Sequence, residues 1–171
     1  MRLATFNIEN LGNDDSDSAP IEERIAVLRP QLQRLRADIL CLQEINAKAK
    51  VDGVRQPASL HRLIEGTGYA DYTLDITSGP KKKGPADVHN LAVLSRYPIL
   101  EREELRQSLV APPTWIRSTA EPADPEPFPV TWDRPIQHLV LELPGGARLH
   151  VFNIHLRAPL AAAVPGQKSG P

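Results

Sequence analysis

The sequence predicts a mixed α/β fold of the α+β kind, in which a mixed β-sheet carries helices on one side. Strand-like segments surround two helical stretches, and the last two strand segments are joined by the hairpin signal Pro144-Gly145-Gly146. Strands combined first with helices and then with hairpins are typical of such a sheet. The 171 residues match the size of one domain.

The first third of the chain predicts a strand, a loop and a helix. Arg2 to Glu9 alternates small or apolar residues with no breaker and runs into the polar stretch Asn10 to Asp15, which predicts a strand followed by a loop. Ser18, followed by proline and acidic residues, is typical of a helix start. Pro30 predicts a kink or two short helices among the apolar residues that recur at helical spacing, which are Ile21, Ile25, Leu28, Leu32 and Leu35.

The later segments supply the rest of the sheet. Ala58 to Glu65 predicts a short helix that ends at a Gly-Thr-Gly turn. The stretch 111–135 holds seven of the 17 prolines, which predicts a long surface loop. Residues 158–171 show no periodic pattern and predict an irregular tail at a truncation point. Strands are predicted over Asp38 to Gln43, Tyr69 to Ile76, Leu91 to Ser95, Ile99 to Leu105, Ile136 to Leu143 and Arg148 to Leu156.

Composition excludes several classes of protein. The formal net charge of −1 excludes a strongly basic nucleic-acid module. No apolar run approaches the roughly 18 residues that a membrane span needs, and the N-terminus lacks the features of a signal peptide. We therefore expect a cytoplasmic protein without a membrane span. The single Cys41 lies in an apolar run, where a thiol packs as a small hydrophobic side chain.

Polar residues gather at the carboxyl ends of three predicted strands. Side chains in a strand alternate between two faces, so Leu3, Thr5, Asn7 and Glu9 are predicted to share a face. The same parity groups Asp38, Leu40, Leu42 and Glu44, and then Leu149, Val151, Asn153 and His155. If the three strand ends lie close together, one pocket is lined by Asn7, Glu9, Glu44, Asn153 and His155.

Two carboxylates, two amides and one imidazole suit metal-assisted phosphoester hydrolysis. Carboxylate and amide oxygens are hard ligands for Mg²⁺ or Mn²⁺, and a nearby histidine exchanges protons with, or donates a hydrogen bond to, a phosphate. Each residue also has a structural interpretation: Asn7 and Glu9 start a turn, Glu44 is a solvated strand end, and His155 is a partly buried histidine with satisfied hydrogen bonds. Parity by itself leaves both interpretations open.

Four segments resemble, in order, the first motifs of the endonuclease/exonuclease/phosphatase superfamily. This superfamily includes DNase I-like nucleases, abasic-site endonucleases, inositol polyphosphate 5-phosphatases and neutral sphingomyelinases. The segments span most of the chain, and they are RLATFNIENL (Arg2 to Leu11), ADILCLQEI (Ala37 to Ile45), NLAVLSRYPI (Asn90 to Ile99) and LHVFNIHL (Leu149 to Leu156).

The resemblance implies a DNase I-like sandwich of mixed β-sheets flanked by helices, with the active site at one end. It implies that Glu44 ligates a divalent cation, usually Mg²⁺, and that Asn7 lies beside the metal and the scissile phosphate. Glu9 stands where some members carry an aspartate, and it joins Glu44 and Asn7 as an expected metal-site residue. His155 matches the first active-site histidine of the DNase I-like branch, and Asn153 is expected to support it.

Two later family motifs are missing. Members carry a Gly-Asp-Phe-Asn-like segment and a terminal Ser-Asp-His-like segment, which supply further catalytic groups, whereas no Asp, Glu, His or Asn follows His155 here. The resemblance therefore implies that residues 1–157 are the N-terminal part of such a domain, its first half. An uncovered sheet face would then promote self-association or pairing with a C-terminal half.

The expected function is a divalent-metal-dependent phosphoester hydrolase: a phosphodiesterase, nuclease or phosphatase. Its substrate is a nucleic acid, a phospholipid or a phosphorylated small molecule, among which the sequence does not choose. The basic run Lys81 to Lys83 and the residues Arg134 and Arg157 are candidates for phosphate contacts or are surface charges. The alternatives are a catalytically inactive binding module of the same fold and a glycoside hydrolase that uses Glu9 and Glu44 as its carboxylate pair.

Overall fold

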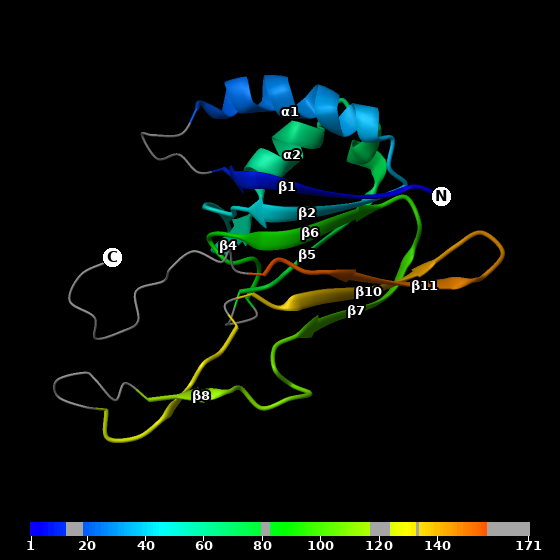
Figure 1. The fold of residues 1–171 in the computed structure, drawn as a ribbon. Coiled ribbons are helices and arrows are strands. Elements are labelled where there is room, and N and C mark those ends of the chain that lie inside the picture. The colour runs from blue at the N-terminus through cyan, green and yellow to red at the C-terminus, as the bar shows by residue number, and fades with distance from the viewer. Residues whose placement is uncertain (13–18, 80–82, 117–123, 133, 157–171) are drawn as a thin grey trace.

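The computed structural model describes residues 1–12, 19–79, 83–116, 124–132 and 134–156 (Figure 1). They form two facing β-sheets with helices over the outer face of the larger one, which confirms the predicted fold class. Among the described residues, no helix combines the length and the apolar character that a bilayer span requires.

The larger sheet has four strands in the order β1-β2-β6-β5, and the smaller has three in the order β11-β10-β7. The β1–β2 pair is parallel and the other pairs within these two sheets are antiparallel, so the larger sheet is mixed, as predicted. The strands are β1 (Leu3–Leu11), β2 (Ile39–Ile45), β5 (Thr73–Ile76), β6 (Asn90–Ser95), β7 (Ile99–Leu105), β10 (Ile136–Glu142) and β11 (Arg148–Asn153).

Two helices and a 3₁₀ turn accompany the sheets: α1 (Ile21–Leu35), α2 (Ala58–Ile64) and η1 (Gly68–Asp71). Two short antiparallel ribbons pair β3 (Ala49–Val51) with β4 (Val54–Gln56), and β8 (Thr114–Trp115) with β9 (Phe128–Pro129). The second ribbon lies in the proline-rich stretch, so the described part of that stretch is not wholly loop. Ser18, residues 117–123 and the predicted tail lie outside the described residues.

The central strands β2 and β6 are buried on both faces, which explains their near-continuous apolar sequences. On the helix side, Leu40 and Leu42 pack into a core with residues of α1 and α2. On the other side, Ile39 and Cys41 pack against the smaller sheet. Burial raises the pKa of the Cys41 thiol to about 11, as expected for a cysteine that packs as a hydrophobic residue.

Helix α1 is one continuous helix that contains Pro30, so the alternative of two short helices is wrong, and the kink at Pro30 stays a prediction. A tyrosine completes its C-terminal end: the Tyr69 hydroxyl donates to the Leu32 carbonyl (3.0 Å) and accepts from the Ala37 N–H (3.0 Å). Tyr69 lies in η1, where a strand was predicted. The short turn places its ring under α1, and strand β5 begins only at Thr73.

The hairpin between β10 and β11 has the predicted turn. Gly145 and Gly146 adopt φ values of 89° and 80°, a conformation that residues with a Cβ atom disfavour and glycine adopts readily. The Leu143 N–H closes the turn on the Ala147 carbonyl at 2.8 Å. Strand β11 ends at Asn153 rather than at Leu156.

A chain of buried polar side chains connects the two sheets. Gln43 of β2 donates to the Asn153 Oδ1 of β11 (2.7 Å), and the Asn153 Nδ2 donates to the Gln137 Oε1 of β10 (3.1 Å). Gln137 in turn donates to the Asp75 Oδ1 of β5 (2.7 Å), and the other Asp75 oxygen pairs with the Arg102 Nε of β7 (3.2 Å). These bonds satisfy groups that would otherwise be costly to bury between two sheets.

The smaller sheet covers the inner face of β2 and β6 but leaves that of β1 open. Strand β1 is at an edge of the larger sheet; Leu3 is 49% exposed, and Thr5 and Asn7 are also exposed. Within the described residues, the uncovered sheet face that the sequence predicted is therefore limited to the inner face of β1. Self-association or pairing with another polypeptide stays a prediction.

The buried Asp75 makes the stability of the fold depend on pH. Burial raises the pKa of the Asp75 carboxyl, although the Gln137 hydrogen bond and the Arg102 charge favour its ionised form. A raised folded-state pKa means that the folded protein binds the proton more tightly than the unfolded chain, so stability from this group increases as pH falls. The unfolding free energy of wild type minus that of Asp75→Asn should rise on acidification by on the order of 1 kcal/mol.

Urea unfolding between pH 7 and pH 4 measures this difference. Asp38→Asn is a control of opposite sign, because hydrogen bonds from Arg96 and the Arg2 N–H lower the pKa of Asp38, and stability from that group is lost as pH falls. A difference for Asp75→Asn that is constant or shrinks on acidification contradicts the assignment.

Candidate functional site

The end of β1 is distorted by a bulge that creates one side of the site. Ile8 and Leu11 both enter the helix-side core, although an unbroken strand would place residues three apart on opposite faces. Between them, Glu9 (φ 53°) and Asn10 (φ 52°) adopt left-handed conformations, and the register with β2 shifts. The Asn7 Oδ1 accepts a bond from the Glu9 N–H at 2.9 Å, which supports the turn.

Strand β2 has a matching irregularity. Leu42 and Ile45 both pack in the helix-side core, and the register with β6 shifts between them. Glu44 lies in this bulge with a φ of 63°. Its side chain consequently leaves the face of Leu40 and Leu42 and lies on the face of Asn7. The prediction that Glu44 shares a face with Leu40 and Leu42 was therefore wrong, because the alternation of side chains stops at the bulge. Glu44 lies beside Asn7 for a different reason, which is the bulge itself.

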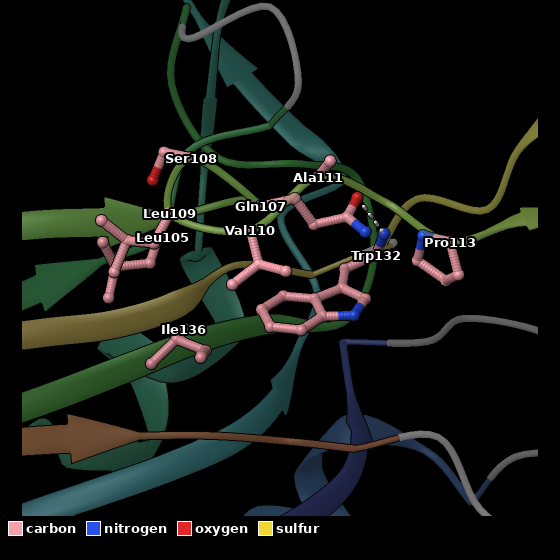
Figure 2. A pocket seen from close by; sticks show the side chains of 9 residues that line it. All are labelled: Leu105, Gln107, Ser108, Leu109, Val110, Ala111, Pro113, Trp132 and Ile136. Carbon is pink, nitrogen blue, oxygen red and sulfur yellow. Dashed lines mark hydrogen bonds between the residues drawn. The ribbon is translucent and has the colours of Figure 1, made fainter.

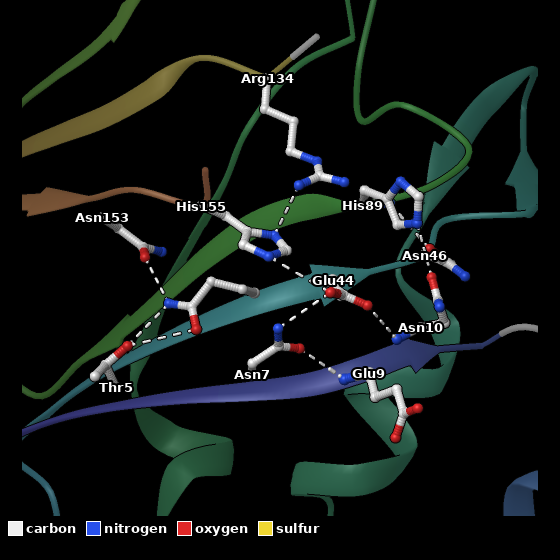
Figure 3. Close-up of polar contacts among 11 residues, drawn as sticks. Thr5, Asn7, Glu9, Asn10, Glu44, Asn46, His89, Arg134, Asn153 and His155 are labelled. Atoms are coloured by element: carbon white, nitrogen blue, oxygen red, sulfur yellow. Dashed lines mark hydrogen bonds and ion pairs between the residues drawn. The ribbon is translucent and has the colours of Figure 1, made fainter. Parts of the chain in front are cut away.

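Glu44 is the centre of the site (Figure 3). Its Oε1 accepts a hydrogen bond from the Asn7 Nδ2 (3.0 Å), and its Oε2 accepts one from the Asn10 N–H (3.0 Å). The His155 Nε2 lies 3.5 Å from Oε1, and the Glu44 and His155 side chains are 17% and 18% exposed. Burial opposes ionisation of Glu44, but the hydrogen bonds from Asn7 and from the Asn10 N–H outweigh it and lower its pKa.

His155 comes from the other sheet, two residues beyond the end of β11. The Arg134 Nη1 lies 2.9 Å from the His155 Nδ1. Because a guanidinium only donates, this contact makes Nδ1 the acceptor of a neutral imidazole and puts the ring proton on Nε2, facing Glu44. Burial and the Arg134 charge lower the pKa of His155, against the opposing effect of Glu44.

Asn153 does not open into the site. Its amide is buried and bonds Gln43, Gln137 and the carbonyls of Leu42 and Ala92. The same Gln43 side chain donates to the Thr5 hydroxyl at 3.0 Å. Asn153 therefore ties the start of the His155 segment to the larger sheet. The expectation that its side chain lines the pocket does not fit this burial, because all the bonds of its amide are used between the sheets.

The Glu9 side chain also lies apart from the other predicted residues. The bulge turns its exposed carboxylate away from Glu44, as Figure 3 shows. Its backbone contributes to the site through the bond between its N–H and Asn7. The expectation that the Glu9 carboxylate lines the pocket does not fit this geometry, since regular alternation ends at Asn7.

Sequence reasoning did not include Asn10, Asn46 or His89 in the site. The His89 Nε2 bonds the Asn10 Oδ1 (2.8 Å), and the His89 N–H donates to the Asn46 Oδ1 (2.9 Å). His89 has a φ of 59°, a conformation that costs a non-glycine residue about 1 kcal/mol or more. His89 directly precedes the family-like segment NLAVLSRYPI. This position next to a motif could have identified His89 as a residue near the site.

The basic candidates have different outcomes. Arg134 reaches the site through His155. Lys81, Lys82 and Arg157 lie outside the described residues.

The donor set fits a cation held through a single carboxylate. Among the described parts of the chain, no group of three His, Cys, Asp or Glu side chains is placed to hold a metal. Magnesium is commonly bound by one or two carboxylates, with waters and substrate phosphate oxygens completing its coordination. Each Glu44 oxygen has one identified hydrogen-bond donor, and a carboxylate oxygen has a second lone pair for a cation.

A separate apolar pocket lies where the proline-rich stretch meets the smaller sheet (Figure 2). Leu105, Val110, Trp132 and Ile136 are among its lining residues, and none of the predicted site residues lines it. The described residues that line it carry no ionisable side chain.

Solved structures of other proteins have a similar fold. The chain is similar to an endonuclease/exonuclease/phosphatase family protein from Leptotrichia buccalis, with 19% identity and a TM-score of 0.56, over 93% of this chain and 56% of that one. It is also similar to an endonuclease/exonuclease/phosphatase from Beutenbergia cavernae, with 21% identity and a TM-score of 0.52, over 94% of this chain and 39% of that one.

This chain thus spans about half the length, or less, of these two structures. A search of curated proteins finds no match. The sequence model of the Endonuclease/Exonuclease/phosphatase family matches residues 4–167, which include the two bulges, Glu44 and His155. This match covers nearly the whole sequence and confirms the resemblance seen in the motifs: the chain belongs to the endonuclease/exonuclease/phosphatase family.

Proposed function

We propose that this chain carries the Glu44 side of the active site of a divalent-metal-dependent phosphoester hydrolase. The observation that supports it best is the arrangement around Glu44, a carboxylate that accepts hydrogen bonds from Asn7 and Asn10 and lies 3.5 Å from the His155 Nε2. Family membership supports hydrolysis of the phosphoester kind. Metal dependence and a nuclease, phosphodiesterase or phosphatase activity are parts of this proposal.

Glu44 is the proposed ligand of Mg²⁺, for which Mn²⁺ is a substitute. The bound cation would polarise a phosphoryl oxygen and stabilise the charge of the leaving oxygen. Asn7 and Asn10 hold the carboxylate in one orientation, and their hydrogen bonds keep it charged, as a ligand must be. Asn7 lies at the exposed face where a substrate phosphate would approach.

His155 and Arg134 are the proposed contacts for the phosphate. The Nε2 proton of His155 can be donated to a phosphate oxygen beside Glu44, and Arg134 holds the imidazole in the tautomer that makes this possible. The other guanidinium N–H groups of Arg134 can pair with an anionic oxygen. Asn153 keeps the His155 segment in place through its buried bonds.

The proposed substrate is a phosphoester of a nucleic acid, a phospholipid or a phosphorylated small molecule. The site as described has donors for a phosphate and no feature that recognises the rest of the substrate. The glycoside hydrolase alternative loses support, because Glu9 points away from Glu44 in Figure 3 and such enzymes need two facing carboxylates. A binding module without turnover stays the alternative that activity measurements distinguish.

Replacing Glu44 tests the proposed metal ligand. Glu44→Gln keeps the shape of the side chain but removes its charge, so Mn²⁺ affinity should fall by about tenfold or more. Metal-dependent hydrolysis of a phosphodiester reporter should disappear, while the melting temperature stays within a few degrees. Electron paramagnetic resonance of free Mn²⁺ measures the affinity. Glu9→Gln is the matched control and should bind Mn²⁺ like wild type; equal binding by both variants would remove Glu44 from the site.

Replacing His155 tests its proposed role in proton donation. His155→Ala should lower turnover of the same reporter by roughly 10²-fold or more, with Mn²⁺ affinity within a few fold of wild type. His150→Ala is the control, because His150 is exposed on the opposite face of β11 and contacts His138. Steady-state rates at saturating Mg²⁺ give the comparison. A His155→Ala protein as fast as His150→Ala makes His155 structural.

Removing the metal distinguishes this function from the alternatives. Phosphodiester hydrolysis should stop in excess chelator and return when Mg²⁺ or Mn²⁺ is added beyond the chelator, because the charge on the phosphate and leaving oxygen needs the cation. Release of a nitrophenol reporter with and without chelator measures this. Turnover that persists in chelator contradicts metal dependence. Binding of Mn²⁺ without any turnover, in a protein that also carries the two later family motifs, favours the binding module.

A further inference from the structure

Helix α1 holds the β1 bulge through one arginine. The Arg24 Nη1 donates to the Asn10 carbonyl (3.1 Å), and its Nη2 donates to the carbonyls of Ile8 (2.6 Å) and Glu9 (2.5 Å). Three consecutive backbone carbonyls therefore converge on one guanidinium. This convergence requires the left-handed conformations of Glu9 and Asn10, since carbonyls in an extended strand point to alternate sides.

The opposite side of the same bulge forms the site. The Asn10 N–H is bonded to the Glu44 Oε2, and the Glu9 N–H is bonded to Asn7, which in turn bonds the Glu44 Oε1. The bulge thus presents its carbonyls to Arg24 and its N–H groups to Asn7 and Glu44. Loss of the guanidinium would leave three clustered carbonyls without this donor and favour a return to extended backbone.

We propose that Arg24 is a positioning residue of the site, which fixes the β1 bulge so that Asn7 and Asn10 hold Glu44. The part of this inference that concerns a cation rests on the proposed function. Arg24 acts through backbone and does not contact Glu44 in the hydrogen bonds described. Its position on the inner side of α1 makes the helix a support for the site as well as a cover for the core.

The same helix supplies a matched control. The Arg29 Nε donates to the Leu63 carbonyl (3.1 Å) and its Nη2 donates to the Arg62 carbonyl (2.5 Å), both at the end of α2. Arg24 and Arg29 are both half-buried, both lie on α1 and both bind backbone carbonyls. The carbonyls bound by Arg24 are in the β1 bulge, and those bound by Arg29 are at the end of α2. Replacing either arginine should therefore lower stability, but only replacement of Arg24 should affect the site.

Lysine variants of both arginines test the inference. Lysine keeps the charge and the aliphatic stem, but its single ammonium group does not reproduce the planar fork of a guanidinium. We expect the Asn10 amide to exchange with deuterium at least tenfold faster in Arg24→Lys than in Arg29→Lys, measured by two-dimensional NMR of the ¹⁵N-labelled chain. Mn²⁺ affinity should fall by several fold in Arg24→Lys alone. Arg24→Met and Arg29→Met, with no charge, should enlarge the same contrast.

The two readouts separate the outcomes. Equal Asn10 exchange in the two lysine variants overturns the inference, whatever the metal data show. Faster Asn10 exchange with unchanged Mn²⁺ affinity also overturns it if Glu44→Gln abolishes Mn²⁺ binding, because the bulge then does not matter to the site. If Glu44→Gln binds Mn²⁺ normally, the proposed function has failed, and the Asn10 exchange by itself decides whether Arg24 holds the bulge. If the methionine variants do not fold, the lysine pair still gives the comparison.

Discussion

Two facing β-bulges are the constraint on which the site depends. In a regular strand, Glu44 would point into the core under the helices together with Leu40 and Leu42, where a charged carboxylate is too costly to bury. The left-handed turns at Glu9, Asn10 and Glu44 break the alternation in neighbouring strands at the same level. Ile8, Leu11, Leu42 and Ile45 can then fill the apolar core while the polar groups between them meet at its edge. Bulges of this kind redirect side chains at functional sites.

The buried polar chain between the sheets supports the site from behind. Gln43 is adjacent to Glu44, and Asn153 is two residues before His155. The hydrogen bond from Gln43 to Asn153, at 2.7 Å, therefore positions the Glu44 segment of the larger sheet relative to the His155 segment of the smaller one. Gln137 and Asp75 extend this connection to β5. An amide left without a hydrogen bond between two sheets costs free energy. These buried hydrogen bonds therefore favour one alignment of the two sheets over others that would preserve the same apolar contacts.

The electrostatics of the site follow from this alignment. Hydrogen bonds from Asn7 and the Asn10 N–H lower the pKa of Glu44 despite partial burial, whereas burial and the Arg134 charge lower the pKa of His155. A carboxylate and an imidazole thus lie 3.5 Å apart, and their different surroundings favour a charged form of the first and a neutral form of the second. This division of states suits a site that receives both a cation and a phosphate.

Patterns along the sequence predict the fold class, the hairpin at Pro144 to Gly146 and the residue types of the site. Apolar periodicity and glycine chemistry are local properties, and the motifs around Asn7, Glu44 and His155 identified the family. Contacts between distant segments set the face on which Glu44 lies and turn Glu9 away from it. They also bring the Asn10 N–H to Glu44, His89 to Asn10, and Arg24 to the carbonyls of the β1 bulge. Alternation along a strand holds only while the backbone stays extended, and the bulges are stabilised by partners far along the chain, such as the Arg24 guanidinium on three β1 carbonyls. Contacts of that range have no signature in the spacing of residues along a single strand.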